Sequence, residues 1–150
     1  MVTMTKAIYF DMDGTIANFY GVPNWLEYLL ENDPTPYKVA RPLLNMTQLA
    51  RLLNALQADG WHIGIVSWLS KNADHDFNEK VAATKKAWLN RHLRSVEWDE
   101  IVIVPYGTPK QEVVEIVGGI LFDDEKPNRS NWIGTAYDVD NILEILKGLR

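Results

Sequence analysis

Short, continuous hydrophobic runs alternate along this chain with longer stretches in which apolar residues recur at helical spacing. The continuous runs predict five strands, at 6–10, 62–66, 101–104, 119–122 and 132–137. The helical spacing predicts four helices, at 23–31, 45–59, 79–93 and 141–149. Prolines and polar residues predict a break at 32–36 and a loop at 70–78. Apolar strands that alternate with helices are typical of a parallel sheet with helices on both faces.

We therefore predict an α/β, Rossmann-like fold with three layers around a central parallel sheet of about five strands. The length of 150 residues suits a single domain across 1–150. The segment from about 17 to 45 lies outside the strand–helix alternation. We expect it to form a small helical, cap-like insertion after the first strand.

Charge and composition exclude several classes of function. The formal net charge is −5, which argues against a general binder of nucleic acids or anionic membranes. The chain has no cysteine, so disulfides, thiolate metal sites and a cysteine nucleophile are excluded. Residues 1–6 are too few and too polar for a signal peptide, and no apolar run reaches the roughly 20 residues of a membrane span. We expect a cytoplasmic protein.

Polar side chains gather where the predicted strands end or begin. They are Asp11 and Asp13 after the first strand, Ser67 after the second, Lys110 before the fourth, and Asp123, Asp124 and Glu125 after the fourth. In an open parallel sheet, ligands bind at the carboxyl ends of the strands, so these groups are expected to face one crevice. Carboxylates crowded in this way need a cation among them. Oxygen ligands without His or Cys favour Mg²⁺.

These motifs, in this order, resemble the haloacid dehalogenase superfamily of phosphotransferases. The matching stretches are FDMDGT (Phe10–Thr15), IGIVS (Ile63–Ser67), Lys110 and GILFDD (Gly119–Asp124). The resemblance covers most of the chain. It implies a Mg²⁺-dependent phosphomonoester hydrolase that works through an aspartyl-phosphate intermediate.

The resemblance also implies roles for individual residues. Asp11 would be the nucleophile and a metal ligand. Asp13 would be the general acid and base, with its backbone carbonyl on the metal. Ser67 and Lys110 would hold the phosphoryl group. Asp123 and Asp124 would complete the metal site, with the direct ligand of the two left open.

A further resemblance is to the 5′(3′)-deoxyribonucleotidase branch of that superfamily. KKAWLNRHL (Lys85–Leu93) looks like the Lys-x-x-Trp helix of that branch. This implies that Lys85 is a second phosphate contact and that the substrate is a (deoxy)nucleoside monophosphate. The insertion here is shorter than in that branch, and Trp68 replaces the usual small or polar residue. A more open crevice would admit a sugar phosphate, a phosphopeptide or a nucleic-acid 3′ end.

Several alternatives stay open at this level. Lys85 lies among other basic residues, so it would equally suit a solvated basic helix face. Aromatic residues near the site would either stack on a substrate ring or pack the insertion onto the domain. These are Phe19, Tyr20, Trp25 and Trp68. Of them, Trp68 adjoins Ser67 and is assigned to the substrate pocket. A non-catalytic binding domain on the same fold would be expected if Asp11 or Asp13 were replaced, and both are present.

Overall fold

A five-stranded, wholly parallel sheet forms the centre of the computed structural model, which describes residues 5–150. Its strands are β1 (Ala7–Phe10), β2 (His62–Trp68), β3 (Glu100–Val104), β4 (Ile120–Phe122) and β5 (Thr135–Tyr137), in the order β3-β2-β1-β4-β5. Phe10, at the end of β1, pairs with Ile65 of β2 and Phe122 of β4. The first strand therefore lies at the centre of the sheet, with a neighbour on each side.

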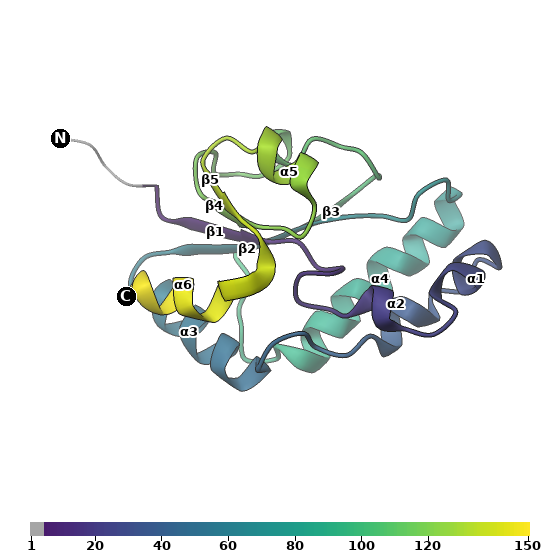
Figure 1. The fold of residues 1–150 in the computed structure, drawn as a ribbon, viewed down its shortest axis with the longest axis horizontal. Helices are drawn as coiled ribbons and strands as arrows, with labels where there is room; N and C mark the ends of the chain where they lie inside the picture. Colours follow the sequence, from purple (N-terminus) through teal and green to yellow (C-terminus); the bar gives the residue numbers. More distant parts are fainter. Residues whose placement is uncertain (1–4) are drawn as a thin grey trace.

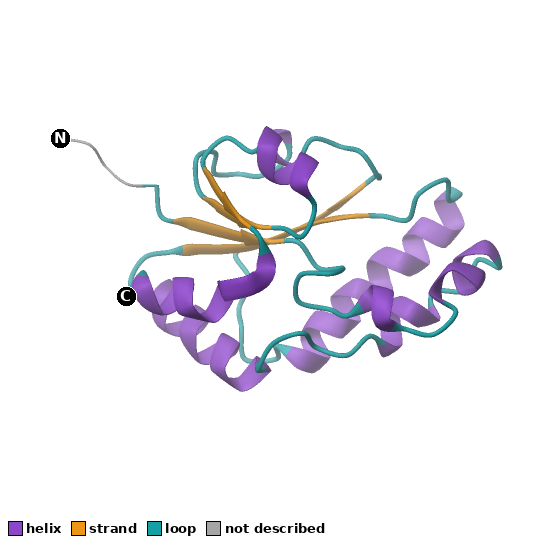
Figure 2. Cartoon of the chain, viewed as in Figure 1, coloured by secondary structure: helices purple, strands orange, loops and turns teal. Residues whose placement is uncertain are grey.

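Among residues 5–150 the structure has six α-helices, and Figure 2 draws the helices in purple. They are α1 (Trp25–Leu30), α2 (Thr35–Val39), α3 (Met46–Ala58), α4 (His75–His92), α5 (Lys126–Asn131) and α6 (Ile142–Gly148). Three short 3₁₀ turns complete the chain: η1 (Phe19–Gly21), η2 (Lys110–Glu112) and η3 (Val139–Asn141). Within residues 5–150, no helix is both long enough and apolar enough to cross a bilayer.

The core lies on both faces of the sheet, because β1 is buried throughout. On one face, Ile8 and Phe10 belong to a large cluster with side chains from α3, α4 and α6. On the other, Tyr9 and Leu121 form a smaller cluster with Trp132. Figure 1 shows α3 and α6 on one side of the sheet and α5 on the other. The predicted three-layer α/β fold with a parallel sheet of five strands is confirmed.

Two element boundaries differ from prediction in ways that matter for the site. Residues 75–78 were predicted as loop, but α4 begins at His75 because the Asp74 carboxylate accepts a hydrogen bond of 2.8 Å from Phe77 N and caps the helix. Strand β2 continues to Trp68 by pairing with β3. Ser67 and Trp68 therefore lie within the strand and are held by its hydrogen bonds.

Two short helices were not predicted. The break assigned to 32–36 is wrong from Thr35 onward, where α2 begins, and α5 occupies residues 126–131, between the fourth and fifth predicted strands, where no element was predicted. Both helices have proline in the first turn, where its missing N–H costs nothing. The last strand, predicted at 132–137, is only Thr135–Tyr137. Residues 1–4, part of the segment judged too polar for a signal peptide, lie outside the described residues.

Candidate active site

The chain turns sharply just after β1, and this turn places the first two acids. Asp11 N donates a hydrogen bond of 2.9 Å to Phe122 O, which continues the pairing of β1 with β4 by one residue. The amides of Thr15, Ile16 and Ala17 then all donate to Met12 O. Asp11 is thereby fixed at the carboxyl end of the central strand, with little freedom to move.

Gly14 allows this turn to approach the second pair of acids. Its φ is +80°, in the left-handed region that other residues disfavour. A Cβ atom built at this position would lie 2.4 Å from a carboxylate oxygen of Asp124. The absence of a side chain therefore lets the β1 turn and the β4 turn come into contact.

Lys110 joins the acids of the two strands. Its ammonium donates hydrogen bonds of 3.0 Å to Asp11 Oδ1 and 2.6 Å to Asp123 Oδ2, and the residue is only 3% exposed. Burial opposes a charge on Lys110, but the carboxylates of Asp11 and Asp123 outweigh it and raise the lysine pKa. The lysine is thus a fixed positive charge beside Asp11.

Asp11, Asp123 and Asp124 form a carboxylate cluster, with one oxygen from each lying within 4.8 Å of the others. Burial and the negative charge of Asp11 raise the pKa of Asp124 to about 8. Three acidic oxygens at this spacing, with no nitrogen or sulfur ligand among them, form a donor set for a hard divalent cation. The residues present therefore fit a metal ion, as the sequence predicts.

Within this cluster, Asp123 and Asp124 are held differently. The Asp123 carboxylate, fully buried, accepts hydrogen bonds from Lys110, Glu125 N and Asn128 Nδ2. Burial and then the charge of Asp11 raise its pKa to about 6, while Lys110 opposes the shift. Asp124 is contacted by the Thr15 hydroxyl at 3.3 Å. The Asp124 carboxylate is therefore held by fewer hydrogen bonds than that of Asp123.

Lys85 reaches the site from the middle of α4. Its ammonium donates to Asp13 Oδ2 at 2.9 Å, Ser67 Oγ at 2.8 Å and Trp68 O at 2.6 Å. Lys85 is only 1% exposed, so it does not belong to a solvated basic face. Burial raises the pKa of Asp13 and the charge of Lys85 opposes that rise. The side chain of Asp13 lies outside the carboxylate cluster and is paired with this second lysine.

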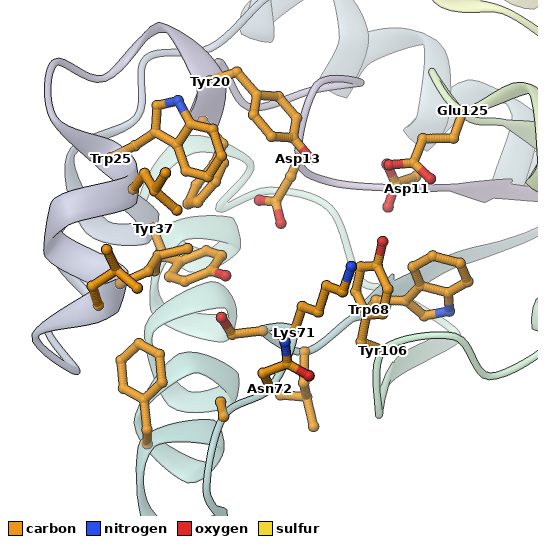
Figure 3. A pocket seen from close by; sticks show the side chains of 18 of the residues that line it. Asp11, Asp13, Tyr20, Trp25, Tyr37, Trp68, Lys71, Asn72, Tyr106 and Glu125 are labelled. Carbon is orange, nitrogen blue, oxygen red and sulfur yellow. The ribbon is translucent and has the colours of Figure 1, made fainter.

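A cavity of about 460 Å³ opens beside these residues. Asp11, Asp13, Lys110 and Glu125 contribute polar groups to it, together with Lys71, Asn72 and Asn128. Its apolar lining comes largely from the insertion and from α4, including Trp25, Leu26, Leu29, Leu30, Tyr37 and Phe77. Figure 3 shows Tyr20, Trp25 and Tyr37 on one side and Trp68 with Tyr106 on the other.

The aromatic residues combine packing with lining, and Phe19, Trp25 and Trp68 all contribute to the cavity wall. Phe19 is buried and stacks on Tyr37, with ring centroids 4.6 Å apart. Trp68 is fixed by an indole N–H bond of 2.8 Å to Thr108 O and packs against Tyr106 at 4.8 Å. The sequence left open whether these aromatic residues pack the insertion or meet a substrate ring, and both interpretations have support. Phe19 packs the insertion, and Trp68 and Trp25 face the cavity.

Sequence reasoning missed several residues that the fold brings to the site. Thr15 and Asn128 hydrogen bond to the predicted acids, and Lys71 and Tyr106 line the cavity. Asn128 lies five residues after Asp123 on the unpredicted helix α5, so recognising the proline-initiated turn would have pointed to it. Tyr106 carried no comparable signal, because its position depends on how the loop after β3 folds back.

The sequence matches no family model and no curated protein significantly. The structure is similar to D,D-heptose 1,7-bisphosphate phosphatase from B. bronchiseptica complexed with magnesium and phosphate, with a TM-score of 0.56 and 14% identity over 97% of this chain and 100% of that chain. It is also similar to D,D-heptose 1,7-bisphosphate phosphatase from Burkholderia thailandensis, with a TM-score of 0.59 and 11% identity over 97% of this chain and 98% of that chain. At these identities, the likeness establishes that the chain shares the fold of these two phosphatases.

Proposed function

We propose that the protein is a Mg²⁺-dependent phosphomonoester hydrolase of the haloacid dehalogenase type. One observation carries the proposal: Asp11, at the end of the central strand, faces a cavity while Lys110 and two further carboxylates surround it. The shared fold with two phosphatases, one of them crystallised with magnesium and phosphate, supports the same assignment.

Asp11 is the nucleophile in this proposal. Its carboxylate oxygen forms a bond to phosphorus while the bond from phosphorus to the leaving oxygen breaks, giving an aspartyl phosphate. Lys110, already bonded to the other oxygen of Asp11, orients that carboxylate and offsets charge on the phosphoryl oxygens. Thr15 holds the second oxygen at 3.2 Å. The nucleophile is therefore oriented before substrate arrives.

Asp13 handles the protons. It gives a proton to the leaving oxygen in the first step and takes one from the attacking water in the second, which releases phosphate and restores Asp11. Its pKa is raised by burial, which favours the protonated form that the first step needs. Lys85, which also donates to Ser67 Oγ, holds Asp13 in place through its hydrogen bond to Asp13 Oδ2.

Asp11 and Asp124 would hold Mg²⁺, with Asp123 beside them and the Asp13 backbone carbonyl as a further proposed ligand. When bound, the ion supplies positive charge that offsets repulsion between the Asp11 carboxylate and the phosphate dianion. The three carboxylates face the single ammonium group of Lys110, so the site has an excess of negative charge. A bound Mg²⁺ would balance this charge.

For the substrate, we propose a (deoxy)nucleoside monophosphate, with residues 17–45 acting as a small cap. The support is the cavity itself, which has an acidic end and an aromatic end formed by Tyr20 and Trp25. Such a cavity suits a molecule with a phosphate at one end and a flat ring at the other. A phosphorylated sugar is the second candidate, because both similar structures are named as heptose bisphosphate phosphatases.

The deciding experiment is a panel of phosphomonoesters assayed with purified protein and Mg²⁺. The panel contains the deoxynucleotides, sugar phosphates, glycerol phosphate and an oligonucleotide with a 3′ phosphate. Asp11→Asn preserves size and removes the nucleophilic charge, so it should abolish turnover while leaving the melting temperature near that of the parent. Asp59→Asn, an exposed position at the end of α3, is the matched control. Residual activity of Asp11→Asn within tenfold of the parent contradicts the nucleophile assignment.

A further inference from the structure

Lys71 lines the cavity without a carboxylate partner. It lies in the loop between β2 and α4, and the other charged groups of the lining are Asp11, Asp13, Lys110 and Glu125. Lys110 is bonded to Asp11 and Asp123, whereas no ion pair found among residues 5–150 includes Lys71. The lining contains two lysines. Lys110 is already paired with carboxylates, whereas the charge of Lys71 is available to a ligand.

The aromatic pair in the cavity wall fixes where this charge lies. Lys71 Nζ is 5.6 Å from the ring centroid of Tyr106, and that ring packs on Trp68 at 4.8 Å. Lys110 Nζ is 5.3 Å from the Trp68 ring. An ammonium group therefore lies near each ring, Lys71 near Tyr106 and Lys110 near Trp68. Of the two, only Lys110 also donates a hydrogen bond to Asp11.

The contact with Tyr106 leaves the ammonium able to bind more. A lysine ammonium has three N–H donors, and a ring face satisfies them only weakly at an exposed site. Figure 3 shows the Lys71 side chain pointing into the cavity beside Tyr106. An anionic group placed there would receive a charge-assisted hydrogen bond, and the ring would limit where the ammonium can move.

Resting on the proposed phosphatase function, we propose that Lys71 is a specificity-determining residue that binds a second anionic group on the leaving portion of the substrate. Asp11 and Lys110 engage the phosphoryl group that is transferred. The part of the leaving portion that bears its own anion lies on the Trp68 and Tyr106 side of the cavity, where that anion meets Lys71. This narrows the substrate proposed above: among nucleotide and sugar phosphomonoesters, the preferred ones carry a second phosphate or a carboxylate, so a nucleoside 3′,5′-bisphosphate is preferred to the plain monophosphate.

Matched substrate pairs test this. The first pair is deoxythymidine 5′-monophosphate and deoxythymidine 3′,5′-bisphosphate, which differ by a phosphate. The second is glycerol 3-phosphate and 3-phosphoglycerate, which differ by a carboxylate. The parent protein should prefer the second member of at least one pair by kcat/KM, and the pair that shows the preference identifies the anion. A parent without preference in either pair overturns the proposal.

Lys71→Met keeps most of the side-chain length and removes the charge. It should lower kcat/KM for the preferred substrate about 10- to 100-fold, the size expected for losing a hydrogen bond to a charged group, and leave the matched partner within about twofold. Lys71→Arg should retain most of the preference. Lys86→Met, at an exposed position on α4, is the control and should change neither substrate. Equal losses on both members, or no loss on either, overturn the assignment.

A binding measurement separates failure of this inference from failure of the phosphatase proposal. The same four compounds are titrated by calorimetry into Asp11→Asn and into the double variant with Lys71→Met. If the parent cleaves none of them, the phosphatase proposal fails and binding alone decides about Lys71. Tighter binding of the second member of a pair that disappears in the double variant upholds the role of Lys71, and equal binding of both members refutes it.

Discussion

The ammonium of Lys85 lies 2.9 Å from a carboxylate oxygen of Asp13 and also donates to the hydroxyl of Ser67 and the carbonyl of Trp68. These three acceptors match the three N–H donors of a lysine. The contacts place Lys85 behind Asp13, on the protein side of the cavity. They favour a role in positioning Asp13, the proposed general acid, whereas the resemblance to nucleotidases implies contact with phosphate.

Lys85→Met separates these two roles. If Lys85 positions Asp13, the variant should lose at least about tenfold in kcat, because proton transfer depends on placement of the acid, while KM stays within about threefold. The melting temperature should also fall, because a buried carboxylate loses its partner. Steady-state kinetics and thermal unfolding measure both. Lys86→Met provides the control, and a rise in KM at unchanged kcat supports the phosphate contact instead.

Gly14→Ala should damage the metal site more than the fold. The added methyl group would meet the Asp124 carboxylate at 2.4 Å, so Asp124 or the β1 turn must move. We expect weaker Mg²⁺ binding and a loss of kcat of about 10²-fold, the size typical of a small displacement at the reacting centre. Activity is measured as a function of Mg²⁺ concentration.

The control for this variant is Gly60→Ala. Gly60 also has positive φ, at +97°, but a Cβ there would meet no atom within 4 Å. It therefore isolates the backbone cost of a side chain in the left-handed region. If the two variants have the same activity and the same Mg²⁺ dependence, contact between Gly14 and Asp124 has no part in catalysis.

Exhaustive chelation should abolish turnover, and Mg²⁺ should restore it. Ca²⁺ should bind but inhibit, because it prefers 6–8 ligands in looser geometry and would misplace the phosphate. Asp124→Asn should raise the Mg²⁺ concentration needed for half activity far more than Asp138→Asn, an exposed position at η3. Mg²⁺ should also raise the melting temperature of the parent, since it relieves repulsion among the acids. Full activity after chelation refutes the metal requirement.

Trp25→Ala should discriminate between substrates. If Trp25 meets a nucleobase, the variant loses about 1–3 kcal/mol of binding on nucleotides, the range known for base stacking, and little on glycerol phosphate. Phe19→Ala is the contrasting variant, because Phe19 is buried on Tyr37. It should lower the melting temperature and affect all substrates alike. Equal losses for Trp25→Ala on both substrates identify Trp25 as a packing residue and remove the main support for a nucleotide substrate.

The sheet and the acids at its edge were predictable because both follow from local pattern. Continuous apolar runs identify buried parallel strands, and residues that follow such strands must lie at one edge. Asp11 and Asp123 meet across β1 and β4 for this reason, although they are far apart in sequence. The pairing of Asp13 with Lys85 was not predictable, since it depends on how α4 rotates its buried face toward β2.

These boundary errors share a cause, which is that the prolines at 32–36 and the polar residues at 70–78 were read as breaks in structure. Pro36 and Pro127 lie in the first turns of helices, and Asp74 caps α4, which begins at His75, four residues before its predicted start. The residues that line the cavity could not be predicted from the sequence either. Lys71 and Tyr106 come from loops whose course is set by tertiary contacts, and neither has a sequence motif of its own.

Helix α1 forms one wall of the cavity, yet none of its residues is buried, and Leu30 is 76% exposed. Its amide protons should consequently exchange with solvent much faster than those of β1, where all four residues are fully buried. Substitutions along this helix cost the fold little, because few core contacts depend on it. Substitutions in α1 can therefore reshape this wall of the cavity while the carboxylates and lysines at the sheet edge keep their positions.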